Sequence, residues 1–165
     1  EAFAALLAEA HRTAARTAAD SPWGDPAAVL DAAQQNIDVL ASQFIDPADA
    51  AAITALRTWI LHEHDVLRNF MAQRQAAGAV RECHGDLHLG NIVLIDNRLV
   101  PFDCIEFNPA LCWNDVLSEA AFLVMDLHDR GSPRLAWLFL NSYLEDTQDY
   151  EGLALLPFHL VYYLC

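Results

Sequence analysis

The sequence predicts an α+β domain that is mostly helical and has one small β-hairpin near its middle. Alanine-rich segments and helical apolar spacings dominate before residue 80, and helical patterns return after residue 110. Between them lie two short β-branched or apolar runs separated by polar residues, which is typical of a hairpin. A chain of 165 residues, of which 55% are hydrophobic, can bury a sizeable core. We therefore expect residues 1–165 to form one domain.

The first half of the chain predicts three helices. Residues 2–18 are rich in alanine and contain no helix-breaking residue, which favours a first helix. Asp25 followed by Pro26 is typical of a helix start, because aspartate caps the first turn and proline lacks an N–H that would stay unpaired there. This pair predicts a helix to about residue 44. Asp46 followed by Pro47 repeats the pattern and predicts a long helix to about residue 77.

The second half predicts a hairpin and three more helices. Residues 91–95 and 99–102 are the two strand-like runs, and Asp96, Asn97 and Arg98 separate them. An isolated hairpin is marginal in water, so we expect this one to pack on helices. Further helices are predicted over 110–128, from Ser132 and Pro133 to about residue 144, and from about residue 152 to the end.

Charge and composition exclude several classes of partner. The chain has 9 basic and 23 acidic residues, a formal net charge of -14, and all the basic residues are arginines. Such a charge argues against nucleic-acid binding and against a polybasic membrane anchor. No apolar run approaches the ~18 residues of a membrane span. The acidity is compatible with a cationic ligand, and equally with a role in solubility alone.

The cysteines and the chain ends give two further expectations. The four cysteines form no Cys-x-x-Cys pair, which predicts reduced, mostly buried thiols in a cytoplasmic protein; they are Cys83, Cys104, Cys112 and Cys165. The chain starts without methionine or a signal peptide and stops inside an apolar, helix-like stretch. We therefore expect it to be part of a longer polypeptide.

Polar residues gather at the two sides of the predicted hairpin. The segment 83–91 leads into its first strand, and the segment 102–106 follows its second strand. Because both segments meet at the open end of a hairpin, we expect Asn91 and Asp103 to lie close together, with Asp86 nearby. Two carboxylates and an amide oxygen are ligands that suit Mg²⁺ better than zinc.

The spacing of these residues is that of a phosphoryl-transfer site. A kinase catalytic loop has His-x-Asp, an Asn five residues after the Asp, and a metal-binding Asp beyond a short hairpin. Here His84 and Asp86 form the first pair, Asn91 follows after five residues, and Asp103 follows twelve residues later. In such a site Asp86 would hold an acceptor hydroxyl, while Asn91 and Asp103 would hold the metal that bridges the phosphates.

The motif His-Gly-Asp-Leu-His at 84–88, with Asn91, resembles the signature of the aminoglycoside phosphotransferase and choline kinase-like superfamily. The longer segment 84–127 is similar to a bacterial group of which some members carry a second, P-loop ATPase-like domain. The resemblance implies the C-terminal lobe of a protein kinase-like fold. Residues 1–79 would then be the helical acceptor-side part, and residues 80–165 would hold the catalytic loop, the hairpin and the C-terminal helices.

The resemblance also implies roles for individual residues. Asp86 would be the catalytic base, Asn91 and Asp103 the Mg²⁺ ligands, and ATP the phosphoryl donor to a small hydroxyl compound, such as an aminoglycoside- or choline-like one. His84 and His88 would order the catalytic loop.

Two acidic residues also have counterparts in the family. Asp115 matches the family's aspartate that hydrogen-bonds the catalytic-loop backbone. Choline kinase-like members have an acidic residue after the metal-binding aspartate, and Glu106 lies one residue beyond that position. From there Glu106 would contact the acceptor or the metal.

Two parts of a working kinase are missing from this chain. No Gly-x-Gly-x-x-Gly loop can be built from its six glycines, and it contains no lysine. We therefore expect the N-terminal lobe to lie outside the chain and these 165 residues to be inactive alone. Two alternatives stay open. One is a catalytically silent kinase-like binding module, and the other is a transition-metal site at His84 and His88.

Other polar and aromatic residues have plainer interpretations. His62 and His64 flank Glu63, but Val66 stands where a zinc-binding His-Glu-x-x-His motif needs its second histidine. A helix surface or a partly buried position is therefore expected for both. Glu119 and Asp126 are expected on a solvated helix face. Tryptophan side chains are expected in the core at Trp59, Trp113 and Trp137. Trp23 is expected in a loop, where contact with a substrate or partner is the less favoured alternative.

Overall fold

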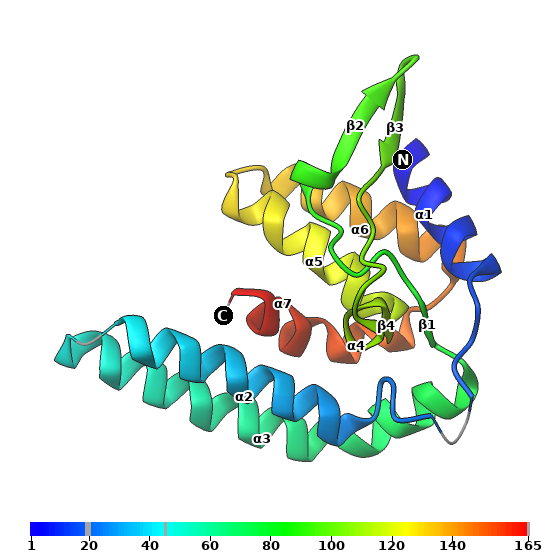
Figure 1. The fold of residues 1–165 in the computed structure, drawn as a ribbon. Coiled ribbons are helices and arrows are strands. Elements are labelled where there is room, and N and C mark those ends of the chain that lie inside the picture. Colours follow the sequence, from blue (N-terminus) through cyan, green and yellow to red (C-terminus); the bar gives the residue numbers. More distant parts are fainter. Residues whose placement is uncertain (19–20, 45, 165) are drawn as a thin grey trace.

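The computed structural model describes residues 1–18, 21–44 and 46–164. Within them the fold is α+β and mostly helical, as the sequence predicts, and it holds two small two-stranded sheets where one hairpin was expected (Figure 1). No helix in this part of the chain combines the length and the apolar character needed to cross a bilayer. The prediction for Cys165 lies outside the described residues.

The first three helices are α1 (Ala2–Thr13), α2 (Pro26–Gln43) and α3 (Pro47–Ala77). The starts of α2 and α3 are confirmed, because the Asp25 and Asp46 carboxylates accept hydrogen bonds from backbone N–H groups of the first turn. The first helix is shorter than predicted. Arg16 instead forms a β-bridge with Arg81, so tertiary pairing overrides the helix propensity of the alanine-rich segment.

A small sheet that the sequence did not predict lies between the helices. Strand β1 (Val80–Glu82) pairs antiparallel with β4 (Trp113–Asp115). The predicted helix over 110–128 is therefore wrong as one element. It is divided into α4 (Pro109–Cys112), β4 and α5 (Val116–Asp129). Asp115 caps α5, since its carboxylate accepts from the backbone N–H of Leu117 at 2.9 Å and the helix starts anew there.

The predicted hairpin is confirmed as β2 (Ile92–Ile95) and β3 (Arg98–Pro101), preceded by the short 3₁₀ helix η1 (Leu89–Asn91). Asp96 and Asn97 form its turn with positive φ angles of 47° and 62°. Packing on helices is confirmed only at the base of the hairpin. The rest projects from the body with exposed apolar side chains at Val93, Leu94, Ile95 and Leu99 (Figure 1).

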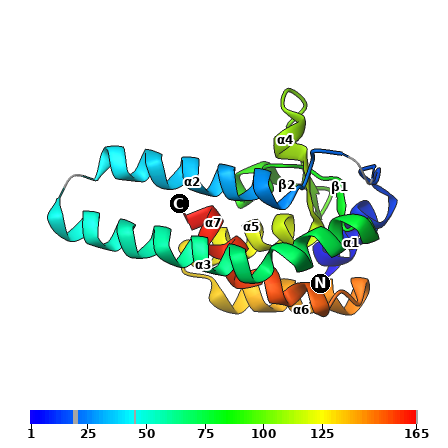
Figure 2. The ribbon, with the colours of Figure 1, turned by 90° about the horizontal axis from the view of Figure 1, so that it is seen from below.

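The core is centred on α5. Its buried face packs against α6 (Pro133–Thr147) and α7 (Leu156–Leu164), which follows the 3₁₀ helix η2 (Glu151–Leu155). Helix α1 packs on α6, and the long α2–α3 pair lies along the other side, next to α7 (Figures 1 and 2). The helix predicted from Ser132 runs slightly further than expected, to Thr147.

Some expected burial is corrected by the structure. Trp137 is 45% exposed, on the outer side of α6, and Trp113 is half-buried, whereas Trp59 packs against the core as predicted. Cys104 is exposed, while Cys112 is buried and Cys83 is half-buried. These three described cysteines are free thiols.

Candidate active site

The loop between β1 and η1 carries the His-Gly-Asp motif and is held against the segment that follows β3. The backbone N–H of Ile105 donates to the His84 carbonyl at 3.0 Å. The His84 ring Nε2 is hydrogen-bonded to the carbonyl of Phe102 at 2.8 Å. These two bonds bring the two polar segments flanking the hairpin side by side.

Two of the three residues proposed for phosphoryl transfer, Asp86 and Asn91, are in contact at the open end of the hairpin. The Asn91 amide nitrogen donates to the Asp86 carbonyl and to Asp86 Oδ2, both at 2.9 Å. The backbone N–H of Phe102 donates to the Asn91 carbonyl at 3.0 Å, which places Asp103 one residue beyond that bond. The segment before β2 and the segment after β3 are thus joined at the open end of the hairpin, because the hairpin register pairs Ile92 with Pro101.

The oxygen atoms at this point fit a hard metal ion. Asn91 uses its amide N–H groups as donors, which leaves the amide oxygen for another partner. Asp103 is exposed and, among the described residues, its carboxylate has no hydrogen bond or ion pair. Its φ of 61° is uncommon for a residue with a side chain and is typical of functional loops. Carboxylate and amide oxygens suit Mg²⁺.

The two histidines of the motif are both hydrogen-bonded within the loop. His84 Nδ1 accepts from the backbone N–H of Asp86 at 3.3 Å, while its Nε2 contacts Phe102. His88 Nδ1 accepts from the backbone N–H of Gly90 at 3.0 Å, and its Nε2 lies 3.5 Å from Asp86 Oδ2. In this arrangement the imidazoles support the loop, so nothing in the geometry favours a transition-metal site at His84 and His88.

Gly85 is required by the shape of the loop. Its φ is +84°, a region that side chains rarely adopt. A Cβ at this position would lie 2.8 Å from the backbone oxygen of Leu111. The loop therefore packs backbone to backbone against the residues before β4, which is possible only with glycine.

Two buried carboxylates of α5 hold the loop from below. Glu119 Oε1 accepts from the backbone N–H of Gly85, and Asp126 Oδ2 accepts from the backbone N–H of Leu89, both at 2.8 Å. Glu119 is 2% exposed and Asp126 is 8% exposed, so the expected solvated face is wrong. The two residues are seven positions apart and so share one face of α5. That spacing, inside a strongly apolar helix, was the signal that could have identified them.

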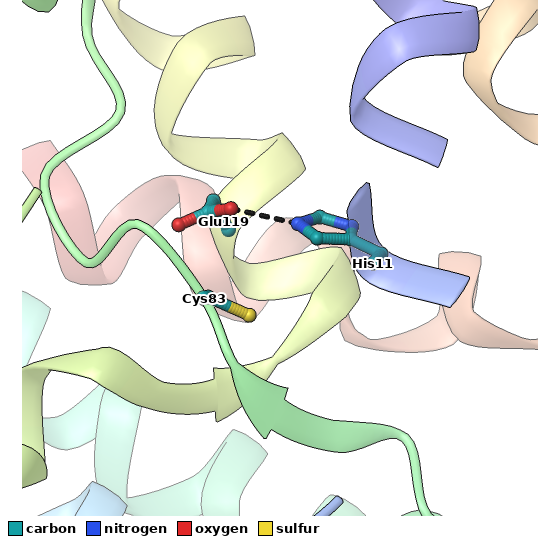
Figure 3. A group of neighbouring side chains, drawn as sticks. All are labelled: His11, Cys83 and Glu119. Carbon is teal, nitrogen blue, oxygen red and sulfur yellow. Dashed lines mark hydrogen bonds and ion pairs between the residues drawn. The ribbon is translucent and has the colours of Figure 1, made fainter. Parts of the chain in front are cut away.

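Glu119 belongs to a buried hydrogen-bond network that the sequence did not reveal (Figure 3). Its Oε2 is 2.7 Å from His11 Nε2 on α1, and His11 Nδ1 is 2.7 Å from the Tyr143 hydroxyl on α6. The thiol of Cys83 lies close by. Its Sγ, a ring nitrogen of His11 and a carboxylate oxygen of Glu119 could each bind a metal, and all three lie within 4.8 Å of one another. Burial, with the nearby charge of Glu119, raises the pKa of Cys83 well above its usual range and keeps the thiol protonated. The cluster thus joins α1, α5 and α6 beneath the loop.

Asp115 was expected to hydrogen-bond the catalytic-loop backbone, but in the structure it has other partners. Its carboxylate accepts two bonds from the Arg74 guanidinium, at 2.6 and 2.9 Å, besides capping α5. Arg74 also donates two bonds to Asp149, both at 2.7 Å. Burial alone would lower the pKa of Arg74, but the hydrogen bonds and charges of the two aspartates outweigh burial and raise it. The loop contacts expected of Asp115 are made by Glu119 and Asp126.

The remaining candidates lie away from this network. Glu106 is exposed on the segment after Asp103. His62 is exposed on α3, whereas His64 is buried, with its Nε2 hydrogen-bonded to the carbonyl of Pro26 at 2.8 Å. His64 therefore ties α3 to the start of α2.

Comparison with known proteins finds relatives without an assigned function. One uncharacterised protein of Mycobacterium bovis and two of Mycobacterium tuberculosis strains are each 27% identical over 162 residues. The match covers 98% of this chain and 32% of each relative, so the chain spans about a third of their length. No family model matches the chain, and no solved structure does.

Proposed function

We propose that this chain is the catalytic-loop half of an Mg·ATP-dependent phosphotransferase that acts on a hydroxyl of a small molecule. The observation that carries the proposal is the contact between Asp86 and Asn91 at the hairpin mouth, where the backbone of Phe102, the residue before Asp103, is bonded to Asn91. In a kinase-like C-terminal lobe this is the arrangement that receives the acceptor and the metal-bound phosphates.

Each residue has a specific task in the proposed reaction. The Asp86 carboxylate, whose side chain is 41% exposed, orients the acceptor hydroxyl and takes its proton. The Asn91 amide oxygen and the Asp103 carboxylate hold Mg²⁺, which neutralises charge on the phosphates when it is bound. Glu119 and Asp126 act as positioning residues, because they hold the loop backbone on either side of Asp86.

The rest of a kinase-like enzyme would come from outside these 165 residues. A lysine and a glycine-rich loop are needed over the phosphates, and the chain contains neither. The relatives are about three times as long as the part they share with this chain, which leaves room for an N-terminal lobe and for a fused P-loop domain. The net charge of -14 favours a neutral or cationic acceptor over an anionic one.

The test is turnover by the full-length protein with Mg·ATP and a panel of aminoglycosides, choline-like alcohols, sugars and nucleosides. Asp86→Asn should lower acceptor-stimulated ADP release by about 10²–10⁴-fold, because the proton acceptor is lost. Asp96→Asn is the matched control: it makes the same change at an exposed turn residue, where asparagine tolerates the positive φ. Equal loss in both variants, or unchanged turnover in Asp86→Asn, would contradict the assignment.

A second readout separates the metal from the base. Asp103→Asn should raise the Mg²⁺ concentration needed for half-maximal rate, whereas Asp96→Asn should leave it unchanged. If no acceptor stimulates turnover and Mg·ATP does not bind, the catalytically silent binding module becomes the better account. A lysine and a glycine-rich loop elsewhere in the full-length protein would support the enzyme, and their absence from the full-length protein would support that second candidate.

A further inference from the structure

Three side chains that can bind a transition metal meet beneath the catalytic loop. They are His11 from α1, Cys83 directly after β1, and Glu119 from α5 (Figure 3). A ring nitrogen, the sulfur and a carboxylate oxygen of these residues all lie within 4.8 Å of one another. Among the described residues, no other three histidine, cysteine, aspartate or glutamate side chains come as close together. We call these three residues the His11 cluster.

The ligand types in the His11 cluster favour zinc. Zinc binds imidazole nitrogen, thiolate sulfur and carboxylate oxygen, whereas Mg²⁺ and Ca²⁺ prefer oxygen ligands alone. One thiolate and one carboxylate balance the charge of a divalent ion. This balance matters because His11 and Glu119 are only 4% and 2% exposed, and an uncompensated charge is costly at such a position.

The two most buried ligands are already oriented by other groups. His11 Nδ1 is 2.7 Å from the Tyr143 hydroxyl, and Glu119 Oε1 accepts from the backbone N–H of Gly85 at 2.8 Å. These contacts leave His11 Nε2 and Glu119 Oε2 facing each other inside the cluster. Metal-binding histidines and carboxylates in proteins are held in this way, with one atom on the metal and the other hydrogen-bonded.

Zinc binding requires only small movements of these side chains. His11 Nε2 and Glu119 Oε2 lie 2.7 Å apart and share a hydrogen bond. The ligands of a tetrahedral zinc ion are roughly 3.3–3.6 Å apart, as bonds of about 2.0–2.3 Å imply. The separations in the cluster therefore have to change by about 1 Å or less.

The protons of the cluster are accounted for in this change. Zinc replaces the thiol proton of Cys83, which leaves to solvent. Zinc also replaces the proton between His11 Nε2 and Glu119 Oε2, and the neutral imidazole then carries its proton on Nδ1 and donates it to the Tyr143 oxygen. Because a proton is released, the affinity for zinc rises with pH.

We propose that His11 Nε2, Cys83 Sγ and Glu119 Oε2 bind a zinc ion that fastens the start of the catalytic loop to α1 and α5. Three protein ligands leave a fourth position for a water molecule. The burial of the cluster is no obstacle, because zinc taken up during folding needs no path through the folded molecule.

This zinc site is separate from the proposed phosphoryl-transfer site. Asp86, Asn91 and Asp103 supply none of its ligands, and the Mg²⁺ proposed there has oxygen ligands only. The zinc site is connected to that loop through the backbone, since Cys83 directly precedes His84 and Glu119 holds the N–H of Gly85. The inference therefore stands whether or not the full-length protein is a phosphotransferase.

Elemental analysis of the full-length protein, expressed with added zinc and dialysed without chelator, tests the site. The wild type should hold one more zinc ion per chain than Cys83→Ser, because a serine hydroxyl replaces the thiolate poorly as a zinc ligand. Cys112→Ser is the matched control and should keep the ion. Its thiol is also buried and donates to a backbone carbonyl, that of Ile105 at 2.6 Å, but lies outside the cluster.

Cobalt substitution identifies the ligands. Co²⁺ in place of zinc gives a sulfur-to-metal charge-transfer absorption when a thiolate is bound. This band should be present in the wild type and in Cys112→Ser, and it should be weaker by the contribution of one site in Cys83→Ser. Glu119→Gln keeps an oxygen for the N–H of Gly85 but removes the negative charge, and should also lose the extra zinc ion.

Two results would overturn the proposal. One is equal zinc content in the wild type, Cys83→Ser and Glu119→Gln, which would place any bound zinc elsewhere in the full-length protein. The other is a wild-type cobalt spectrum without a sulfur-to-metal band. That spectrum needs no variant, so the test stays decisive even if Cys83→Ser does not fold. Neither readout depends on Mg·ATP turnover, so a failure of the zinc site is distinguishable from a failure of the proposed enzyme.

Discussion

At the scale of single residues, backbone conformation decides what the candidate site can present. Gly85 has a φ of +84° and allows the loop to pack directly on the backbone of Leu111. Asp103 adopts a φ of 61° in spite of its side chain, which leaves its carboxylate exposed at the hairpin mouth. The cost of such a conformation is of order 1–3 kcal/mol and is tolerated where the surrounding structure holds the residue in place.

His159 gives a pH dependence of stability at this scale. In the unfolded chain the imidazole takes up a proton as the pH falls below its ordinary value of 6.5, but in the fold burial lowers its pKa to about 4. Proton uptake between these values therefore favours the unfolded chain, and stability that is complete above pH 6.5 is lost as the pH falls. Relative to His159→Phe, the wild type should lose about 2 kcal/mol between about pH 7.5 and about pH 5.

Urea unfolding of the wild type and His159→Phe at both pH values measures this difference. The neighbouring charges named by the structure are those of Asp115 and Arg74, which have opposite effects on the pKa of His159 and are present in both proteins. Parallel pH dependence of the two proteins would show that His159 is not held neutral by burial.

At the scale of elements, α5 connects the candidate site to the core. One face of the helix is apolar and fully buried at Leu117, Ala121 and Val124. The same helix places Glu119 and Asp126 under the two ends of the catalytic loop. The loop is therefore anchored at two points to the most buried helix of the fold.

The junction of α3, α5 and the segment before η2 depends on Arg74. Arg74→Met removes the buried partner of Asp115 and Asp149, which are themselves only partly buried, and should cost about 3 kcal/mol of unfolding free energy. Arg68→Met on the same helix removes an exposed ion pair with Asp65 and should change stability little. Urea unfolding at pH 7 compares the two variants. Similar losses for both would show that the Arg74 network contributes no more than a surface pair.

At the scale of the whole molecule, stability is unevenly distributed. The hairpin β2–β3 projects from the body with Leu94 63% exposed, whereas α5 lies between α6 and α7. Amide hydrogen exchange followed by mass spectrometry should therefore show faster exchange for 93–100 than for 117–127, because few apolar contacts protect the hairpin. Equal protection of both segments would indicate that another part of the full-length protein covers the hairpin.

Local signals were sufficient where structure depends on neighbouring residues. Asp25 and Asp46 predicted the starts of α2 and α3 because a cap acts within one turn. Asp96 and Asn97 predicted the hairpin because a tight turn selects residues that tolerate positive φ. Asp86 and Asn91 were expected near each other because both lie at the open end of the predicted hairpin, and in the structure one 3₁₀ turn before the first strand brings them into contact.

Long-range pairing was what the sequence could not reveal. Strand β4 lies in a stretch with helical propensity, and only its partner β1 more than thirty residues earlier makes it extended. Glu119 and Asp126 were expected at the surface because charged side chains are usually exposed. Their burial becomes favourable only because backbone N–H groups of the distant catalytic loop hydrogen-bond to them.

The sequence by itself determined the helical character, the hairpin and the nearness of Asp86 and Asn91, because propensity, capping and short-range spacing act within a few residues. Only the tertiary structure decided the β1–β4 pairing and the network of His11, Glu119 and Tyr143. These depend on segments up to 132 residues apart, where burial and hydrogen-bond satisfaction, not local preference, set the free energy.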